Sequence, residues 1–428
     1  MDFLGETFSA VGRGLLAVWW LWTALFAGWL FAMLWLAWRQ CLYKKINWTL
    51  FEIKIPRELK KGPQAMEHIL ANMATLHNVQ GNLREKWWDG EITQWFSLEV
   101  VSFGGDIHFF IRTPSRHANF IRANIYAQYQ DMELEEVDDY VNRLPATTFE
   151  LYERSYNLWG AELFLGKGDG LPIRTYKQFE DLEEERNIDP IAGLLEVLAN
   201  INTEEIVMVE MLSRPAPPAL WPMKVKKEAE KFREETKAVM KGPMGEEYEI
   251  FTRTPGETEK MKQIEAKAFK PAFDVLIRYV YLAPQRIYNI NFAKRGVRAA
   301  FMQFSAPNLN FFLANPRTWT QAWLWDWPHV FPKHILEGRK QRMFLNYRER
   351  AMPEETFLGK LFKFHIFTSS FKQKLSLMNV EELATIFHLP TAAVLTQPLL
   401  KRVESRRMGP PAGLPIFKEG GKTPGVLE

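Results

Sequence analysis

The sequence predicts an α+β protein with one N-terminal transmembrane helix followed by ferredoxin-like (βαββαβ) units, the second of which carries a long helical insertion. Two observations support this fold class. First, residues Gly14 to Trp38 contain no charge and are bounded by Arg13 and Arg39. Second, segments with strand period and segments with helix period then follow one another in the order strand, helix, strand, strand, helix, strand.

The uncharged stretch at 14–38 is long enough to cross a bilayer as a helix. At about 1.5 Å per residue it extends roughly 37 Å, and a hydrocarbon core is about 30 Å thick. A signal peptide or a buried hairpin is the alternative, but a signal peptide has a shorter apolar region and a small-residue cleavage site. Cations are more frequent after the stretch than before it. We therefore expect an extracytoplasmic N-terminus (1–13) and a cytoplasmic bulk, anchored in the cytoplasmic (inner) membrane.

Composition excludes some classes of protein. The net charge of +3 gives no sign of a bulk polyanionic partner, and a single cysteine, Cys41, excludes an internal disulfide and a cysteine metal cluster. Cys41 lies at the membrane edge, where acylation is the alternative to an incidental residue. The remaining chain is long enough for two or three domains.

The first ferredoxin-like domain is predicted at 48–145. Residues 50–56 alternate apolar and polar side chains, and 63–76 carry apolar residues at helical spacing. Gly104-Gly105-Asp106 is the predicted turn between strands at 94–103 and 107–113. A second helix and an acidic strand at 132–137 complete the unit, with both helices expected on one face of an antiparallel sheet.

A second α+β domain, 146–378, is predicted to repeat this order. Strands are expected in 149–165, 205–212 and 273–282, and helices after Asp189-Pro190 and over 284–301. The final strand is placed at 361–367 or nearer Leu375. The insertion at 214–270 is charged and has helical segments, so we expect it to form a projecting arm.

A basic aromatic segment at 333–350 has two interpretations. Phosphate contact and base stacking would use its cations together with Tyr347 and Phe344. A solvated helix face is the alternative. The nucleic-acid interpretation assigns the contacts to Arg339, Lys340, Arg342, Arg348 and Arg350.

The last region, 379–428, is predicted to be a short helix followed by a Pro/Gly-rich tail. Asn379 and Glu382 have the spacing of a capping box. His388 and the strand residue His108 are interpreted as structural residues. Gly421-Lys422-Thr423 is rejected as a P-loop, because Ile416 stands where the loop requires glycine. No catalytic, cofactor-binding or metal-binding residues are assigned.

Several stretches resemble the membrane-linked N-terminal region of type IV secretion coupling-type ATPases (TraG/TraD-like and HerA-like), in the form found in candidate-phyla (Patescibacteria) bacteria. The resemblance covers most of 48–415, and Val380 departs from the usual Thr. The matching stretches are Phe51–Pro56, Gln94–Ser102, His108–Ile111, Ile125–Tyr129 and Asn379–Pro390. In that family an Arg- and Pro-rich linker then leads into the P-loop motor, whereas this chain ends there. The resemblance therefore implies a version without the motor, whose ATPase is encoded separately or lost.

These observations predict a membrane-anchored, non-enzymatic platform that docks a P-loop DNA-translocation or secretion ATPase. The residues expected to dock the partner are Glu381, Glu382, Leu383, His388 and Pro390. A membrane-tethered nucleic-acid-binding protein is the alternative, and an enzyme with an unrecognised site is a third hypothesis. Expected partners are membrane lipid and the ATPase, with DNA and a second copy of the chain as further candidates.

Overall fold

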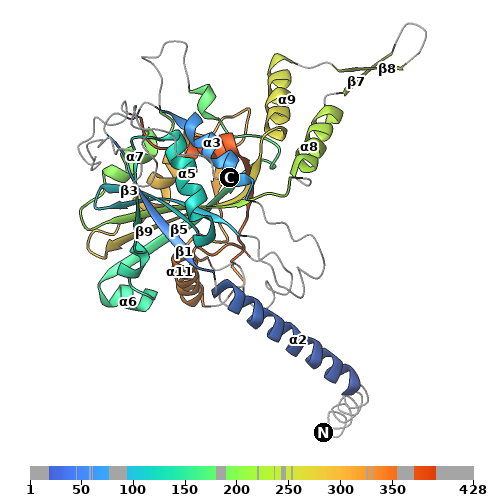
Figure 1. Ribbon diagram of the computed structural model, residues 1–428. Helices are drawn as coiled ribbons and strands as arrows, with labels where there is room; N and C mark the ends of the chain where they lie inside the picture. Colours follow the sequence, from blue (N-terminus) through green and yellow to red (C-terminus); the bar gives the residue numbers. More distant parts are fainter. Residues whose placement is uncertain are drawn as a thin grey trace, which may run out of the picture.

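The computed structural model describes residues 19–44, 46–56, 59, 61–76, 94–179, 189–218, 221–235, 237–241, 247–251, 254–323, 326–327, 329, 331–353 and 371–391. They form a mixed α+β protein built on one 9-stranded sheet, in which every pair of neighbouring strands is antiparallel. Helices cover both faces of this sheet, while an arm and the helix α2 extend away from it (Figure 1).

The sheet has two halves, which we call half one (residues 48–137) and half two (residues 156–314). Half one contains the elements in the predicted order. They are β1 (Trp48–Lys54), α3 (Pro63–Ala74), β2 (Phe96–Phe103), β3 (Asp106–Pro114), the 3-10 turn η1 (Ser115–His117), α5 (Ala118–Gln128) and β4 (Glu133–Val137). The strands lie in the order β2-β3-β1-β4. Gly104 and Gly105 both have positive φ, so they supply the left-handed turn between β2 and β3 that other residues resist.

Half two, residues 156–314, has the corresponding strand order β6-β9-β5-β10. Two 3-10 turns and one helix precede or interrupt it: η2 (Tyr140–Arg143), α6 (Thr148–Glu153) and η3 (Tyr176–Gln178). Its own elements are β5 (Tyr156–Leu165), α7 (Ala192–Ala199), β6 (Ile206–Pro215), β9 (Ala272–Pro284), the π-helix η5 (Phe292–Gly296), α10 (Val297–Met302) and β10 (Phe312–Ala314).

The two halves are joined edge to edge into one sheet. β2 of half one pairs with β6 of half two over the whole length of β2, from Phe96 opposite Ser213 to Phe103 opposite Ile206. The complete order is therefore β10-β5-β9-β6-β2-β3-β1-β4. Each half has its second strand at the junction and its fourth strand at the outer edge.

The edge strand of half two differs from the prediction. We expected it at 361–367, which lies outside the described residues, or nearer Leu375. The strand that follows α10 and borders β5 is instead β10, whose three residues pair with Leu163 to Leu165. A strand does lie near Leu375, β11 (Ser376–Asn379), but it pairs with the first residues of β9. A three-residue strand is too short for side-chain alternation to reveal it.

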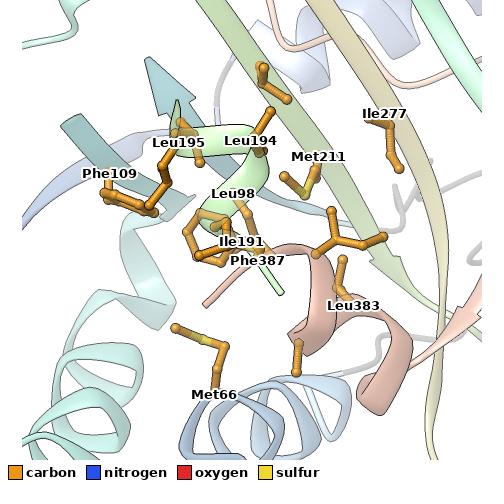
Figure 2. Packing of buried hydrophobic residues seen from close by; sticks show 14 of the residues in the cluster. Met66, Leu98, Phe109, Ile191, Leu194, Leu195, Met211, Ile277, Leu383 and Phe387 are labelled. Atoms are coloured by element: carbon orange, nitrogen blue, oxygen red, sulfur yellow. The ribbon is translucent and has the colours of Figure 1, made fainter. Parts of the chain in front are cut away.

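The main core lies between one face of the sheet, which we call the first face, and five helices. These helices are α3, α5, α7, α10 and α13 (Val380–Ile386). Figure 2 shows Leu383 and Phe387, at the C-terminal end of the described chain, pointing into the same cluster as Met66 of α3 and Ile191. The ring centroids of Phe387 and Phe109 of β3 are 6.0 Å apart. Residues near the end of the described chain therefore help to complete the core of half one.

The second face is covered by α6, η2 and α11 (Pro332–Arg348). Met343, Phe344 and Tyr347 of α11 pack onto Leu158, Val280 and other apolar residues of the strands. This side carries the smaller apolar cluster, because charged and polar side chains occupy much of the sheet beneath α11.

The arm consists of α8 (Trp221–Glu235), β7 (Lys237–Lys241), β8 (Glu247–Phe251) and α9 (Pro255–Ala268). The two expected helices are present and lie side by side, while the hairpin of β7 and β8 at their far end was not predicted (Figure 1). A capping box of Thr254 and Glu257 begins α9. The arm leaves the sheet between β6 and β9, where half one has only its two-glycine turn.

The N-terminal apolar stretch forms α2 (Trp19–Lys44), and residues 14–18 of the predicted span lie outside the described residues. Among the described helices none is found that is long and apolar enough to span a membrane.

Candidate functional site

The basic segment at 333–350 lies in α11 and just after it, against the second face. Arg339 and Arg350 are fully buried. Arg339 pairs with Asp326 at 3.2 Å and donates to the main-chain carbonyl of Gln321. Both guanidinium groups are buried and held in internal ion pairs, so this structure does not present Arg339 or Arg350 to a phosphate.

Three further cations of the segment also contact the protein itself. Lys340 donates to Asn157 Oδ1 at 2.7 Å, and Arg342 is half-buried and not free of partners. Arg348 donates to three main-chain carbonyls in and after η2, those of Val141, Leu144 and Pro145. The segment is therefore neither an open basic face nor a fully solvated one, because its charges hold α11 to the rest of the fold.

Beneath α11, four charged residues lie directly opposite one another on four neighbouring strands. We call Glu99, Glu210, Arg278 and Glu162, on β2, β6, β9 and β5, the charge row. All four are buried. Arg278 lies between two carboxylates: it pairs with Glu162 at 3.1 Å on one side and with Glu210 on the other. It also donates to the main-chain carbonyl of Asn346 at 2.9 Å, which fastens α11 to the row.

The residues directly opposite Glu99 are Phe110 of β3 and Glu210 of β6, so its paired cation comes from Arg350. The guanidinium of Arg350 lies 3.0 Å and 3.1 Å from the two carboxylate oxygens of Glu99. The same group also holds both oxygens of Asp139, at 2.7 Å and 2.9 Å. Planar bidentate pairing of this kind is the strong form of an arginine–carboxylate contact. Tyr140 donates a further hydrogen bond to Glu99 at 2.6 Å.

Glu99 and Glu210, which lie opposite each other on β2 and β6, have pKa values shifted in opposite directions. Burial raises the pKa of Glu210 to about 8, because the pairing with Arg278 only partly offsets desolvation and the nearby charge of Glu99. Burial also acts to raise the pKa of Glu99, but the charge of Arg350 and hydrogen bonds from Arg350, Ser97 and Tyr140 outweigh it, so the pKa falls. Burial lowers the pKa of the neighbouring Arg112 to about 10.

Adjacent carboxyl groups with pKa values shifted apart also occur in acid–base catalysis. A catalytic role would require that these side chains be accessible to a substrate. The side chains of Glu99, Glu210, Arg278 and Arg350 have no exposed surface at all. A catalytic acid or base must reach a substrate proton within hydrogen-bond distance. The charge row is closed to solvent, so its arrangement fits a structural network between the sheet and α11.

The residues predicted to dock a partner are docked onto this chain. Asn379 and Glu382 form the expected capping box at the start of α13, which is confirmed. Glu382, Leu383, His388 and Pro390 are buried, and Glu381 is largely so. Glu382 pairs with Lys267 of α9 at 2.9 Å, with both side chains fully buried. These positions are therefore covered by α3, α9 and the loop after β5, and do not form a free surface.

Both ring nitrogens of His388 are used in contacts within the protein. One of its partners is Asp189, the residue predicted to begin a helix. Its Nε2 lies 2.7 Å from Asp189 Oδ1, and its Nδ1 lies 2.9 Å from the carbonyl of Ala384. Asp189 also accepts from the main-chain N–H of Ile191 before α7 and from Thr391. Burial acts to raise the pKa of Asp189, but the His388 contact and these hydrogen bonds outweigh it and lower the pKa. Asp189 thus joins the start of α7 to the end of the described chain.

The charge row and Lys267 were missed by sequence reasoning. The available signal was a single charge inside an apolar strand, such as Glu210 in a run from Ile206 to Leu212 or Arg278 in one from Val275 to Tyr281. Such a charge must be paired when the strand is buried on both faces. Which charges pair depends on strand register, and that is not visible in the local pattern. Within the described ranges, no group of three or more His, Cys, Asp or Glu side chains is arranged to hold a metal ion.

The fold and its buried polar clusters define the class: a mixed α+β protein in which one antiparallel sheet is fastened to its covering helices by internal ion pairs. The matched family model spans both halves of that sheet together with the arm. The chain belongs to the family described as Domain of unknown function (DUF8128), whose model matches residues 40–320. The comparison with curated proteins finds no match.

Proposed function

We propose that the protein is a membrane-anchored, non-enzymatic platform that docks a P-loop ATPase of a DNA-translocation or secretion system. The proposal rests on the resemblance described above and on one structural observation, the exposed apolar surface of α2. In this proposal α2 contacts the lipid of the cytoplasmic membrane, and the sheet with its arm lies on the cytoplasmic side.

The exposure of α2 supports contact with lipid. Trp19, Trp20, Leu21 and Trp22 are consecutive and all exposed, Trp19 by 63% and Trp22 by 51%. Four consecutive residues point in nearly all directions around a helix of 3.6 residues per turn. Large apolar patches exposed to water mark interaction sites, and a groove in a partner protein would cover only one side of the helix. Further along, Leu25, Phe26, Phe31 and Leu34 are exposed as well.

The arm supports a docking role. Figure 1 shows α8 and α9 leaving the sheet in a different direction from α2, so that the β7–β8 hairpin lies far from the helix assigned to the membrane. Half one, by contrast, closes the same position with two glycines, so the arm is dispensable for forming this kind of sheet. An extended element that the sheet does not need is a reasonable place for a partner to bind.

We also propose that each half is a ferredoxin-like unit. In each, two helices on one face accompany four antiparallel strands in the order of second, third, first and fourth strand. This is the arrangement produced when two βαβ crossovers are joined by a hairpin.

The nucleic-acid alternative gains no support from the segment at 333–350, since Arg339 and Arg350 are buried in internal ion pairs. It would need a different surface.

The first experiment is purification of the tagged full chain from membranes of its source organism, with every copurifying protein identified. We expect a P-loop ATPase at near-stoichiometric yield. Membrane-extracted protein that carries no such ATPase, or that carries nucleic acid instead, would count against the proposal.

Anchoring is tested separately with the variant L25R/L34R. An arginine at the centre of a membrane helix costs about 2.5–3.5 kcal/mol on insertion scales, so this variant should shift to the soluble fraction. The matched control is F149R/M223R, which changes two exposed apolar residues outside α2. The control should stay with the membrane, and equal behaviour of the two variants would refute lipid contact by α2.

A further inference from the structure

The root of the arm and the C-terminal segment, residues 376–391, share one buried junction. Leu377 of β11 belongs to the same apolar cluster as Trp221 and Val225 of α8 and Ile264 of α9. Leu377 is 2% exposed, so the arm root and the C-terminal segment cover each other. Neither can leave its place without exposing apolar surface of the other.

A buried cation makes this junction specific. Lys267, in the last turn of α9, has a side chain with no exposed surface. Its ammonium pairs with Glu382 at 2.9 Å and donates to the carbonyl of Leu377 at 2.9 Å. An unpaired buried charge is strongly unfavourable, so Lys267 can remain in place only while the C-terminal segment is seated.

A second contact reaches the junction from α8 through the loop after β5. Glu228 of α8 accepts a hydrogen bond from Gly170 N at 2.5 Å. A Cβ at Gly170 would lie 2.1 Å from the Glu228 carboxylate, and one at Gly168 would lie 2.7 Å from it, so these glycines make room for the carboxylate. In the same loop, Asp169 accepts from Leu377 N at 3.3 Å. The loop therefore joins α8 to β11 without a hydrogen bond or ion pair between Glu228 and β11.

A third contact extends the junction to half one. Lys270, two residues after α9, pairs with Glu67 of α3 and with Glu381 of α13. Lys270 thus joins the chain after the arm both to the first helix of the sheet and to the C-terminal helix. The ends of the arm are held by residues far away in the sequence.

We propose that these contacts form a coupling joint: the arm and the C-terminal segment are seated together, so that a partner protein that displaces or fixes the arm changes the seating of residues 376–391, and the reverse. Equilibrium coupling of two sites is reciprocal, which makes the inference testable in both directions. The joint concerns the chain's own contacts and does not depend on which partner the platform docks.

The forward test uses E228A in the full chain in detergent, read by hydrogen–deuterium exchange. Glu228 does not contact the C-terminal segment, so only a joint predicts faster exchange there. We expect amide exchange across 376–391 to rise about tenfold, the size of effect expected when local opening becomes easier by the loss of one partly buried, charged hydrogen bond. The matched control is E230A, an exposed glutamate on the same helix, which should leave 376–391 unchanged.

The reverse test uses E382Q, which removes the charge paired with Lys267 and keeps one side-chain oxygen able to accept the cap hydrogen bond. We expect faster exchange in α9 as well as in 376–391. E381Q, on the neighbouring and partly exposed glutamate, is the comparison for a general effect on α13, and it should leave α9 less affected than E382Q. Exchange that changes only locally in either test, in α8 and the loop alone for E228A or in α13 alone for E382Q, would overturn the proposal.

Discussion

Half one and half two place glutamates at corresponding positions of the sheet and neutralise them in different ways. In half one, Glu52 of β1 lies opposite Phe110 of β3, which lies opposite Glu99 of β2. In half two, Glu162 of β5 lies opposite Arg278 of β9, which lies opposite Glu210 of β6. The strand positions correspond, and Phe110 occupies the place of Arg278.

The difference shows how one strand arrangement can accept two electrostatic solutions. Half two carries its cation within the sheet, so Glu162 and Glu210 are paired by a neighbour on the next strand. Half one has a phenyl ring there, and Glu99 is paired by Arg350, which follows α11 in the sequence. Its other glutamate, Glu52, is half-buried and lies 2.6 Å from His108. The stability of half one therefore depends on residues outside it, and that of half two on Arg278.

The largest expected effect follows from removing the cation of half two. R278M leaves Glu162 and Glu210 buried without a cation, and breaking a buried pair in this way costs about 3–5 kcal/mol. Urea unfolding of the variant should show a loss of that size. R295M, on an exposed arginine of η5, is the control and should change the free energy of unfolding by less than about 0.5 kcal/mol.

The neutral triple variant E162Q/E210Q/R278M sharpens this prediction. It removes Arg278 together with both carboxyl groups that face it, and replacing a whole buried ion cluster is often nearly neutral. We expect it to be more stable than R278M alone. If R278M and its control unfold at the same urea concentration, the charge row is not what holds half two to α11.

Removing the cation of half one should cost somewhat less. R350M leaves Glu99 buried and unpaired, but its second partner, Asp139, is 27% exposed and can be solvated. We expect a loss of about 3 kcal/mol, at the low end of the range for broken buried pairs. Because Arg350 follows α11, hydrogen exchange should also rise across 332–348. Unchanged exchange there would show that Arg350 holds Glu99 without holding α11.

Sequence reasoning predicted the elements of half one well, because each had a local signal. Alternation marked β1, helical spacing of Met66, Ile69 and Met73 marked α3, and the glycine pair marked the turn. The capping box of Asn379 and Glu382 was also local and is confirmed. Local patterns suffice where a helix or strand has one face buried against its own unit.

The long-range features were not predictable in this way. The joining of the halves through β2 and β6, the three-residue strand β10, and the pairing of Arg350 with Glu99 all depend on contacts between distant residues. The basic segment at 333–350 was predicted to lie at the surface, because its charges give no local sign of where their partners lie. Lys267 was predicted to belong to a projecting arm for the same reason, although it is buried.

The glycine turn of half one occupies the position that the arm occupies in half two, and a substitution there should have a smaller effect. Gly104 has a φ of 59°, and a Cβ there would lie 2.4 Å from the carbonyl oxygen of Thr203 in half two. G104A should therefore destabilise the protein by about 1–3 kcal/mol through backbone strain and this collision. Thermal unfolding measures the loss, and G256A is the control, because a Cβ at Gly256 meets no atom within 4 Å. Equal melting temperatures for the two variants would contradict the close approach of the halves at this turn.

The last test distinguishes Glu99 and Glu210 by pH. Burial raises the pKa of Glu210 in the folded protein to about 8, from an ordinary value of 4.5, so between these values the folded state binds a proton that the unfolded state has lost. The free energy of unfolding should therefore fall as pH rises from 4.5 to 8, by up to about 1.4 kcal/mol per pH unit from this group. Glu99, whose pKa is lowered in the folded protein, is ionised in both states at pH values well above 4.5 and adds little slope there.

E210Q removes the titrating group and should flatten the pH dependence between 5 and 8 relative to the parent protein. E204Q, on a glutamate that is 46% exposed, should leave the slope as it is. Urea unfolding at a series of pH values gives both slopes. If E210Q retains the full slope, the proton is held elsewhere, and the two corresponding glutamates do not differ in the way that their cations imply. If the slope disappears, Glu210 is the group that holds the proton. Which of the two glutamates keeps its charge then depends on where its arginine lies: Arg278 within the sheet for Glu210, and Arg350 after α11 for Glu99.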